Sequence, residues 1–254
     1  MRKKLTAGLM LVAVMLGLGA APSVAALPSY HPSKLAHVGS SRQVIVVTGT
    51  GRGTTRATLR AYEKNANGSW SLKMSTPARN GYAGWAWANK RVQDTGTSPI
   101  GTFRITTTFG LKANPGTKLR YTRVDGNDWW AGDARDPKTY NLFQKRGPST
   151  RTWRKSQSER LASYPTQYQY AAVINFNRPP ASTVTWDAKR GQFVTSKPAN
   201  VKRGSAIFLH VNGSGSTAGC VSVSRTAMVK ILTWLDPAKT PRIVMAPLAD
   251  IRKA

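Results

Sequence analysis

The stretch from Gly204 to Val221 reads GSAIFLHVNGSGSTAGCV, and it decides how this chain can be interpreted. It opens with an apolar run of strand length that ends at His210, continues through a loop of small residues, and closes on Gly219-Cys220. Glycine and serine allow the tight reversal that would follow a strand. We therefore expect the histidine at the end of a sheet, ten positions before the cysteine in the sequence.

The two reactive residues of this stretch are rare in the chain. Cys220 is the only cysteine, and the other two histidines, His31 and His37, lie near the N-terminus. A thiol reacts as its thiolate, and an imidazole is the usual group that generates one at neutral pH. The pair suits acyl transfer through a thioester. A half-buried cysteine in a glycine-rich loop with an incidental histidine is the alternative that spacing alone leaves open.

Composition indicates a folded protein with an anionic partner. The chain has 254 residues, 40% of them hydrophobic, with eight tryptophans and eight tyrosines, which is enough for a sizeable core. Its formal charge is +28, because 38 lysines and arginines face only 10 acids. Such an excess favours nucleic acid, acidic lipid or an anionic cell envelope as surroundings, without choosing among them.

The N-terminus predicts a secretory signal peptide over residues 1–26. Arg2, Lys3 and Lys4 precede an apolar run from Leu9 to Ala21, and small residues around Ala25 suit cleavage. An uncleaved anchor is the alternative, although the run is short for a membrane span. Cleavage would remove three positive charges and no acids, leaving +25. Export argues against nucleic acid and for the anionic polymers of a cell wall as partners.

Export also makes the lone cysteine informative. A single cysteine cannot form an internal disulfide, and a free thiol outside the cytoplasm is open to oxidation. Cys220 is therefore either buried and inert or kept for its reactivity, and the residues alone do not choose.

The remaining patterns predict one mainly β domain over residues 42–254, after a flexible lead-in over 27–41. Alternating or β-branched strands are expected at 42–48, 55–63, 70–74, 101–109, 168–175, 206–211 and 242–246. The segment 110–165 is expected to form long irregular connections. One clear helix is predicted after the Gly-Cys loop, with Ser224 as N-cap and an apolar stripe of Met228, Ile231, Leu232 and Leu235.

Four patches carry a family resemblance. They are Ser98–Phe103, which follows the pattern [ST]-P-x-G-x-[FY]; Trp130–Asn141, ending in Asp-Pro-x-x-Tyr-Asn; Ala172–Asn177; and Gly204–Val221. In these patches the chain resembles the L,D-transpeptidase (YkuD-like) family, in the branch of the ErfK-like proteins of actinobacteria. The resemblance runs from about Val44 to Val244. It implies a β-sandwich-like domain with its site at one end.

The resemblance also implies an activity. Members transfer a peptidoglycan stem tetrapeptide: a cysteine attacks the carbonyl of an L-centre–D-Ala bond, releases D-Ala, and passes the acyl group to a neighbouring stem as a 3→3 cross-link. Carbapenem β-lactams acylate that cysteine. By motif, Cys220 is the nucleophile and His210 the general base, while Gly219, Cys220 and Ala218 supply oxyanion-hole amides. No cofactor and no metal are implied, and a monomer acting on stem peptides is expected.

Further roles follow less directly from the same resemblance. A backbone carbonyl in Ser216-Thr217 is expected to orient the imidazole, since no acid is near in sequence. Ser222, Asn175 and Arg178 are candidates for substrate contacts. Many members have a longer spacer between the histidine and the cysteine, a histidine at the position of Ala218, and an arginine or asparagine at that of Ser222.

Two other groups of residues are expected to have ordinary structural roles. Asp133 and Asp136 are expected in a solvated loop rather than around a cation. Trp85 and Trp87 share one strand face and are expected to pack in the core rather than stack on glycan. Two functions compete with transpeptidation: an L,D-carboxypeptidase or hydrolase in which water replaces the acceptor amine, and a non-catalytic, basic cell-wall-binding protein.

Overall fold

The computed structural model describes residues 27–145 and 150–254, so the predicted signal peptide lies outside the described residues. The main strands are β1 (Gln43–Gly49), β2 (Arg56–Lys64), β3 (Trp70–Arg79), β4 (Trp85–Trp87), β5 (Ser98–Gly110), β6 (Arg120–Arg123), β10 (Ala171–Ile174), β13 (Phe208–Val211), β14 (Val221–Val223) and β15 (Arg242–Pro247). Smaller sheets use β7 (Asp128–Trp130), β8 (Phe143–Lys145), β9 (Glu159–Arg160), β11 (Val184–Asp187) and β12 (Gln192–Thr195). In the described ranges α1 (Arg225–Trp234) is the one α-helix, and no helix is long and apolar enough to cross a membrane.

The main sheet closes on itself. Its strands run in the order β10-β13-β14-β3-β2-β1-β15-β5-β4, and β10 pairs with β5 as well as with β13. The pairs β1–β15 and β13–β14 are parallel, whereas β1–β2, β2–β3 and β10–β13 are antiparallel. Closure pairs strand edges that would otherwise be exposed. The mainly β, sandwich-like architecture predicted from the sequence is confirmed, with its two layers joined through β10 and β5.

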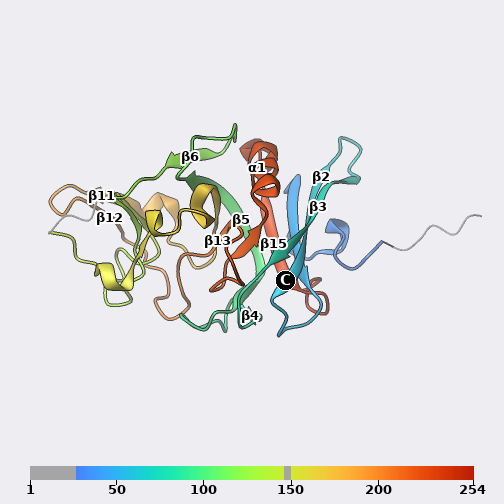
Figure 1. Cartoon of the computed structure of the whole chain (residues 1–254). Helices are drawn as coiled ribbons and strands as arrows, with labels where there is room; N and C mark the ends of the chain where they lie inside the picture. Colours follow the sequence, from blue (N-terminus) through green and yellow to red (C-terminus); the bar gives the residue numbers. More distant parts are fainter. Residues whose placement is uncertain (1–26, 146–149) are drawn as a thin grey trace, which may run out of the picture.

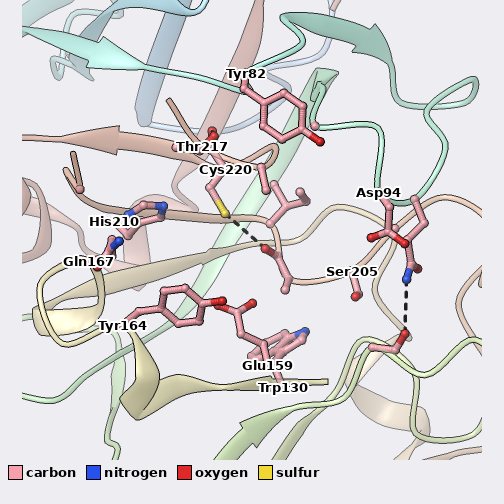
Figure 2. Close-up of a pocket in the computed structure, with 18 of the residues that line it drawn as sticks. Tyr82, Asp94, Trp130, Glu159, Tyr164, Gln167, Ser205, His210, Thr217 and Cys220 are labelled. Atoms are coloured by element: carbon pink, nitrogen blue, oxygen red, sulfur yellow. Dashed lines mark hydrogen bonds between the residues drawn. The ribbon is translucent and has the colours of Figure 1, made fainter. Parts of the chain in front are cut away.

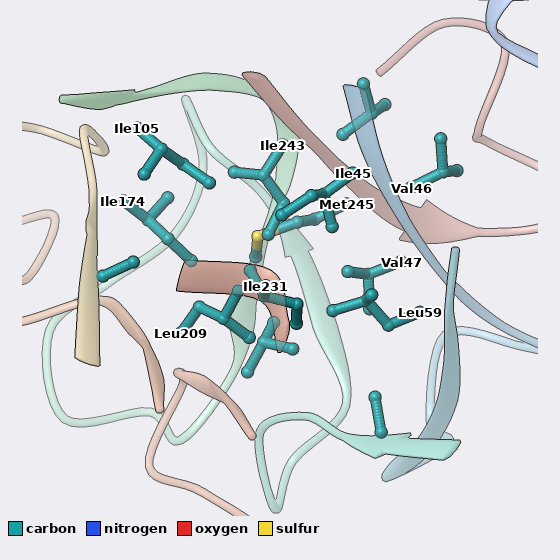
Figure 3. Close-up of a cluster of buried hydrophobic side chains, with 14 of the residues drawn as sticks. Ile45, Val46, Val47, Leu59, Ile105, Ile174, Leu209, Ile231, Ile243 and Met245 are labelled. Atoms are coloured by element: carbon teal, nitrogen blue, oxygen red, sulfur yellow. The ribbon is translucent and has the colours of Figure 1, made fainter. Parts of the chain in front are cut away.

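The principal core fills the inside of this closed sheet, as Figure 3 shows. The β-branched run of β1 is buried at every position, because β2 and β15 flank it on both sides. In β2 the predicted alternation holds, since Ala57, Leu59 and Ala61 are at most 9% exposed. In β3 it fails at Leu72, which is 52% exposed. Leu72 lies at an irregularity in the β2–β3 pairing, where Ala61 is opposite Met74 but Tyr62 is opposite Leu72.

The predicted helix forms where the sequence placed it. The Ser224 hydroxyl accepts a hydrogen bond from the Ala227 N–H at 3.2 Å and caps α1. The apolar stripe faces the core, and the chain leaves the helix at Leu235, before Asp236-Pro237. The four stripe residues are all fully buried: Met228, Ile231, Leu232 and Leu235.

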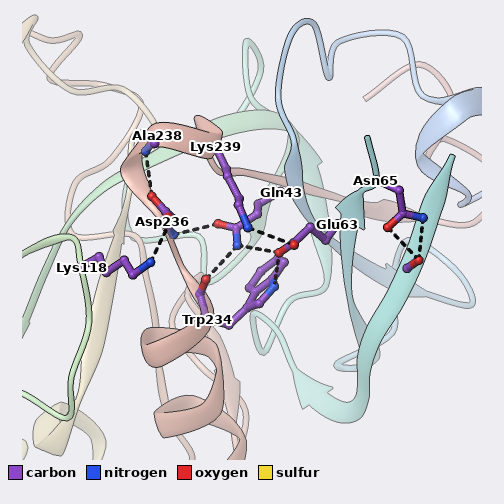
Figure 4. A network of polar contacts seen from close by, with 9 residues as sticks. Gln43, Glu63, Asn65, Lys118, Trp234, Asp236, Ala238 and Lys239 are labelled. Carbon is purple, nitrogen blue, oxygen red and sulfur yellow. Dashed lines mark hydrogen bonds and ion pairs between the residues drawn. The ribbon is translucent and has the colours of Figure 1, made fainter. Parts of the chain in front are cut away.

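A polar network fixes the end of this helix to the sheet (Figure 4). The Gln43 side chain donates to the Trp234 carbonyl at 2.8 Å and accepts from the Asp236 N–H at 2.8 Å. Glu63 receives the Trp234 indole N–H at 2.9 Å and the Lys239 ammonium at 3.0 Å. These bonds join the C-terminal end of α1 and the residues after it to β1 and β2.

The middle of the chain has more order than its composition suggested. It was expected to be irregular over 110–165, yet β7 pairs with β8 and β9, and β6 joins the main sheet beside β5. These strands have two to four residues, which is too short for a readable alternation. With the β11–β12 hairpin they form the end of the molecule opposite β2 and β3 (Figure 1).

The lead-in over 27–41 was expected to be flexible, and this is corrected by its packing. Leu35 is 6% exposed and belongs to the principal core. The Ser41 hydroxyl donates to the carbonyls of Gln43 and Thr240, each at 2.8 Å. The domain therefore begins before residue 42.

Candidate active site

Strand pairing brings the histidine and the cysteine to one face of the sheet. His210 lies on β13, and Cys220 immediately precedes β14, which pairs with β13 in parallel and places Leu209 opposite Val221. Because side chains alternate along a strand, Leu209 enters the principal core while Phe208 and His210 point to the other face. Cys220 packs on that second face in an aromatic cluster that includes Phe208.

The loop between them is held by two buried hydroxyls. Thr217 Oγ1 donates to the Cys220 carbonyl at 2.5 Å and accepts from the Gly219 N–H at 3.2 Å. Ser98 Oγ, which is fully buried, donates to the Gly219 carbonyl at 2.8 Å and accepts from the Gly81 N–H at 2.9 Å. The Ser98–Phe103 patch thus has a physical role: its serine clamps the cysteine loop from β5.

A cavity of about 700 Å³ opens at this place. Its lining includes Cys220, His210, Arg91, Glu159 and Tyr164. Figure 2 shows these walls coming from different parts of the chain, with Cys220 on one side and Glu159 on the other. The cavity is large enough for a peptide segment, and both candidate reactive groups reach it.

The thiol is protonated in this resting arrangement. Cys220 Sγ donates to the Ala206 carbonyl and accepts from the Phe208 N–H, both at 3.3 Å, and neither bond involves His210. Burial, followed by the negative charge of Glu159, raises the pKa of Cys220 to about 12; the Phe208 N–H and the Arg91 charge act in the opposite direction. The Ala206 carbonyl and the Phe208 N–H, each 3.3 Å from the sulfur, fix its position without removing the thiol proton.

The imidazole is neutral and its tautomer is set. His210 Nδ1 lies 2.7 Å from the Val211 carbonyl, to which it donates, so that Nε2 carries the free lone pair. The expectation that Ser216 or Thr217 supplies the orienting carbonyl is therefore corrected: the partner is the adjacent residue, which spacing arguments overlooked. Burial lowers the pKa of His210 to about 4, and the Val211 bond opposes this. The Tyr168 ring stands edge-on to the imidazole, with centroids 5.6 Å apart.

The backbone amides of the loop divide into two groups. Gly219 has a φ of +132°, and its N–H is already bound to Thr217. The N–H groups of Ala218 and Cys220 have no acceptor within the described chain. Of the three amides expected to form an oxyanion hole, Ala218 and Cys220 are thus available, and Gly219 serves the loop's own geometry.

Arg91 is packed against the back of the same loop. Its Nε donates to the Thr97 carbonyl and its Nη1 to the Arg203 carbonyl, both at 2.7 Å. A Cβ on Gly219 would lie 2.8 Å from Arg91 Nη2, and one on Gly204 only 1.8 Å from Nη1. These two glycines make room for a guanidinium that is 4% exposed and that faces the cavity.

Asn141 organises the wall behind the sulfur. Its Oδ1 accepts from the Trp130 indole at 2.8 Å and from the Ala206 N–H at 3.1 Å, while Nδ2 donates to the Asn177 carbonyl at 2.6 Å. Asn141, Asn177 and Ala206 all have left-handed backbones, with φ of 60°, 48° and 55°. Such strain in non-glycine residues persists where surrounding contacts impose it. Here it sets the direction of the Ala206 carbonyl, which accepts the hydrogen bond from the Cys220 thiol.

Comparison with known proteins agrees with this geometry. The family model of the L,D-transpeptidase catalytic domain (YkuD) matches residues 38–244, which is most of the chain. The chain belongs to this family. No curated protein and no solved structure gives a significant match.

Three residues expected to contact substrate in this L,D-transpeptidase domain lie elsewhere. Ser222 is fully buried and donates to Asn212 Oδ1 at 2.8 Å. Asn175 is exposed outside the cavity lining. Arg178 lies behind the wall, its guanidinium 4.7 Å above the Trp130 ring, where burial lowers its pKa to about 10. Arg178 therefore contacts Trp130, which lines the cavity, and does not line the cavity itself.

Asp133 was expected in a solvated loop, which is wrong, because the residue is 2% exposed. Asp133 is tied by both oxygens to the Arg154 side chain, at 2.6 and 2.7 Å, which lowers the Asp133 pKa to about 2. In the described part of the chain no three potential ligands gather around a metal position. Trp85 is buried in the principal core, and Trp87 packs against that core from its edge.

Arg91, Glu159, Tyr164 and Tyr168 are among the cavity residues that sequence reasoning missed. Each is more than 40 residues from Cys220 along the chain, and none stands in a motif. Glu159 lies on β9, a strand of two residues. The one usable signal was the scarcity of acids, because a glutamate within a strongly basic segment is uncommon in this sequence.

Proposed function

We propose that this protein is an exported, cysteine-dependent L,D-transpeptidase that forms 3→3 cross-links between peptidoglycan stem peptides. One observation carries the proposal: in a domain of this family, the only cysteine and a tautomer-fixed histidine line the same cavity. The formal charge of +25 that would remain after cleavage of the predicted signal peptide supports the location, since a basic protein would be held against anionic wall polymers.

The first half-reaction follows from the protonation states. With pKa values of about 12 for Cys220 and about 4 for His210, the resting pair is neutral rather than an ion pair. The thiol would rotate away from the Ala206 carbonyl and pass its proton to His210 Nε2 as sulfur attacks the substrate carbonyl carbon. The resulting oxyanion would be received by the Ala218 and Cys220 amides. The imidazolium then protonates the amine of D-Ala as the C–N bond breaks, leaving a Cys220 thioester.

A second candidate function rests on the resting state of the sulfur. Its hydrogen bonds go to Ala206 and Phe208 and it is 8% exposed, which is what a non-catalytic wall-binding protein of this family would also have. The enzyme and the binding protein differ in whether the Cys220 side chain can rotate toward a substrate, and a chemical experiment distinguishes them.

The experiment is product analysis with a disaccharide-tetrapeptide. Transpeptidation predicts free D-Ala and a cross-linked dimer from the wild type, and neither from Cys220→Ala. Formation of tripeptide without dimer would indicate an L,D-carboxypeptidase rather than a transpeptidase. If no product forms and Cys220 resists thiol reagents while the protein is folded, the non-catalytic wall-binding protein would be the supported function.

A further inference from the structure

Two acids, Asp94 and Glu159, line the cavity, and Glu159 is the one whose charge acts on the nucleophile. Its carboxylate accepts a short hydrogen bond from the Tyr168 hydroxyl through Oε1. Its other oxygen, Oε2, receives no hydrogen bond within the described chain, and the residue lines the cavity. In Figure 2 its side chain rises from the wall opposite Cys220 and is directed toward the same space.

This placement is unfavourable for the cysteine alone. A negative charge near a thiol disfavours its thiolate, and Glu159 raises the pKa of Cys220. In a chain with 38 basic residues and 10 acids, a glutamate at this position works against the first half-reaction unless something cancels its charge. No lysine or arginine forms an ion pair with it in the described part of the chain.

An ammonium group of the substrate would cancel that charge. We propose that Glu159 binds the primary ammonium of the acceptor stem and takes its proton, so that the neutral amine can attack the Cys220 thioester. This inference rests on the proposed transpeptidase function and assigns to Glu159 the second half-reaction, as His210 serves the first. The cavity then has a recognition element for the acceptor and not only for the donor.

The step balances in atoms and charge. The ammonium gives one proton to the Glu159 carboxylate, and the neutral amine forms a C–N bond with the thioester carbonyl carbon. The second proton leaves the nitrogen for His210 Nε2, the C–S bond breaks, and the Cys220 thiolate takes that proton from the imidazolium. Glu159 returns its proton to solvent. No oxidant, reductant or cofactor enters.

The surroundings of Glu159 suit a group that accepts and releases a proton near neutrality. Burial raises the pKa of Glu159 to about 7, and the Tyr168 hydroxyl opposes this. The titratable groups that face Glu159 are Tyr168, Tyr164 and Cys220. The negative charge of Glu159 raises the pKa of each of the three. None of these three carries a positive charge that would hold Glu159 permanently ionised, so both of its forms are accessible.

The test is Glu159→Gln, which keeps an oxygen for the Tyr168 hydroxyl and removes only the charge. Glu63→Gln is the matched control, because it makes the same chemical change in the polar network at the far end of α1. Each variant is given disaccharide-tetrapeptide as donor and acceptor. D-Ala release, dimer and tripeptide are measured, and circular dichroism confirms the fold.

Glu159→Gln is expected to release D-Ala no more slowly than the wild type while the dimer-to-tripeptide ratio falls on the order of 100-fold, the usual size of a lost general base. Glu63→Gln should leave that ratio unchanged. An unchanged ratio in a folded Glu159→Gln, or D-Ala release that falls together with dimer formation, overturns the role of Glu159 while the proposed function stands. Absence of D-Ala release from the wild type overturns both.

Discussion

Ser98→Ala is the substitution that most directly separates the scaffold of the site from its chemistry. The Ser98 hydroxyl is fully buried and joins two loops, accepting from the Gly81 N–H at 2.9 Å and donating to the Gly219 carbonyl at 2.8 Å. Alanine fits the same space and removes both bonds. The Gly81 amide and the Gly219 carbonyl are then left without partners in a dry environment.

The magnitude follows from those two groups. A buried backbone group left unpaired costs about 1–3 kcal/mol, so the free energy of unfolding should fall by about 2–4 kcal/mol. For a domain of this size that lowers Tm by roughly 5–15 °C. Loss of the clamp also frees the loop that positions Cys220, and a displacement of about 1 Å can cost 100-fold in rate. We expect carbapenem acylation of Cys220 to slow by 10-fold or more.

Ser41→Ala provides the control for stability. Its hydroxyl is also buried and bonds to two carbonyls, of Gln43 and Thr240, but it lies outside the cavity lining. Both variants are compared by thermal unfolding and by the rate of acylation, followed by intact mass at a temperature where each is folded. Both should lose stability, and only Ser98→Ala should lose acylation rate. A Ser98→Ala protein that acylates as fast as the wild type would refute the clamp.

Three further predictions concern the loop, the imidazole and the buried arginine. Gly219→Ala should abolish acylation, because Gly219 has a φ of +132° and an added Cβ would lie 2.8 Å from the Thr97 carbonyl oxygen. Gly215→Ala is the control and should acylate normally, because an added Cβ there would have no heavy atom within 4 Å. Equal acylation rates in the two variants would contradict the strain argument. The pKa of His210 is about 4 in the folded protein against 6.5 in the unfolded chain, so the unfolded state binds more protons as the pH falls and His210 destabilises the fold at low pH. Glu159, whose pKa is raised to about 7, acts in the opposite direction, so wild type is compared with His210→Asn in urea titrations. Between pH 7.5 and pH 4.5 the free energy of unfolding should change by about 2–3 kcal/mol less favourably in wild type than in His210→Asn, and equal changes would contradict the low pKa of His210. Arg91→Met should raise the pKa of Cys220, since the positive charge of Arg91 lowers that pKa. Alkylation of Cys220 in the folded protein at pH 9 should therefore slow at least threefold. An unchanged alkylation profile would contradict this role of Arg91.

The sequence was a good guide where the pattern was long or chemically distinctive. The apolar stripe of α1 and its Ser224 cap are local features, and both are as expected. The apolar run before His210 forms β13 (Phe208–Val211), which contains the histidine. Closure of the sheet through β10 and β5 depends on pairing between distant strands, so nothing local reveals it.

The walls of the site were the unpredictable part. Arg91 and Glu159 reach the cavity through tertiary packing, and neither the turn before β5 nor the two-residue β9 has a readable period. The orienting carbonyl of Val211 was missed because a ring bonding to the next residue leaves no spacing signal. Ser222 was misplaced because its position two residues after the cysteine suggested proximity, whereas its buried hydroxyl bonds to Asn212.

The central claim is that Cys220 is a nucleophile despite its protonated resting state. Intact mass spectrometry after incubation with a carbapenem tests it most directly, using wild type, Cys220→Ala and His210→Ala. We expect one acyl adduct on the wild type, none on Cys220→Ala, and acylation slowed by about 100-fold or more on His210→Ala. No adduct on the folded wild type, or an adduct that survives in Cys220→Ala, would contradict the account.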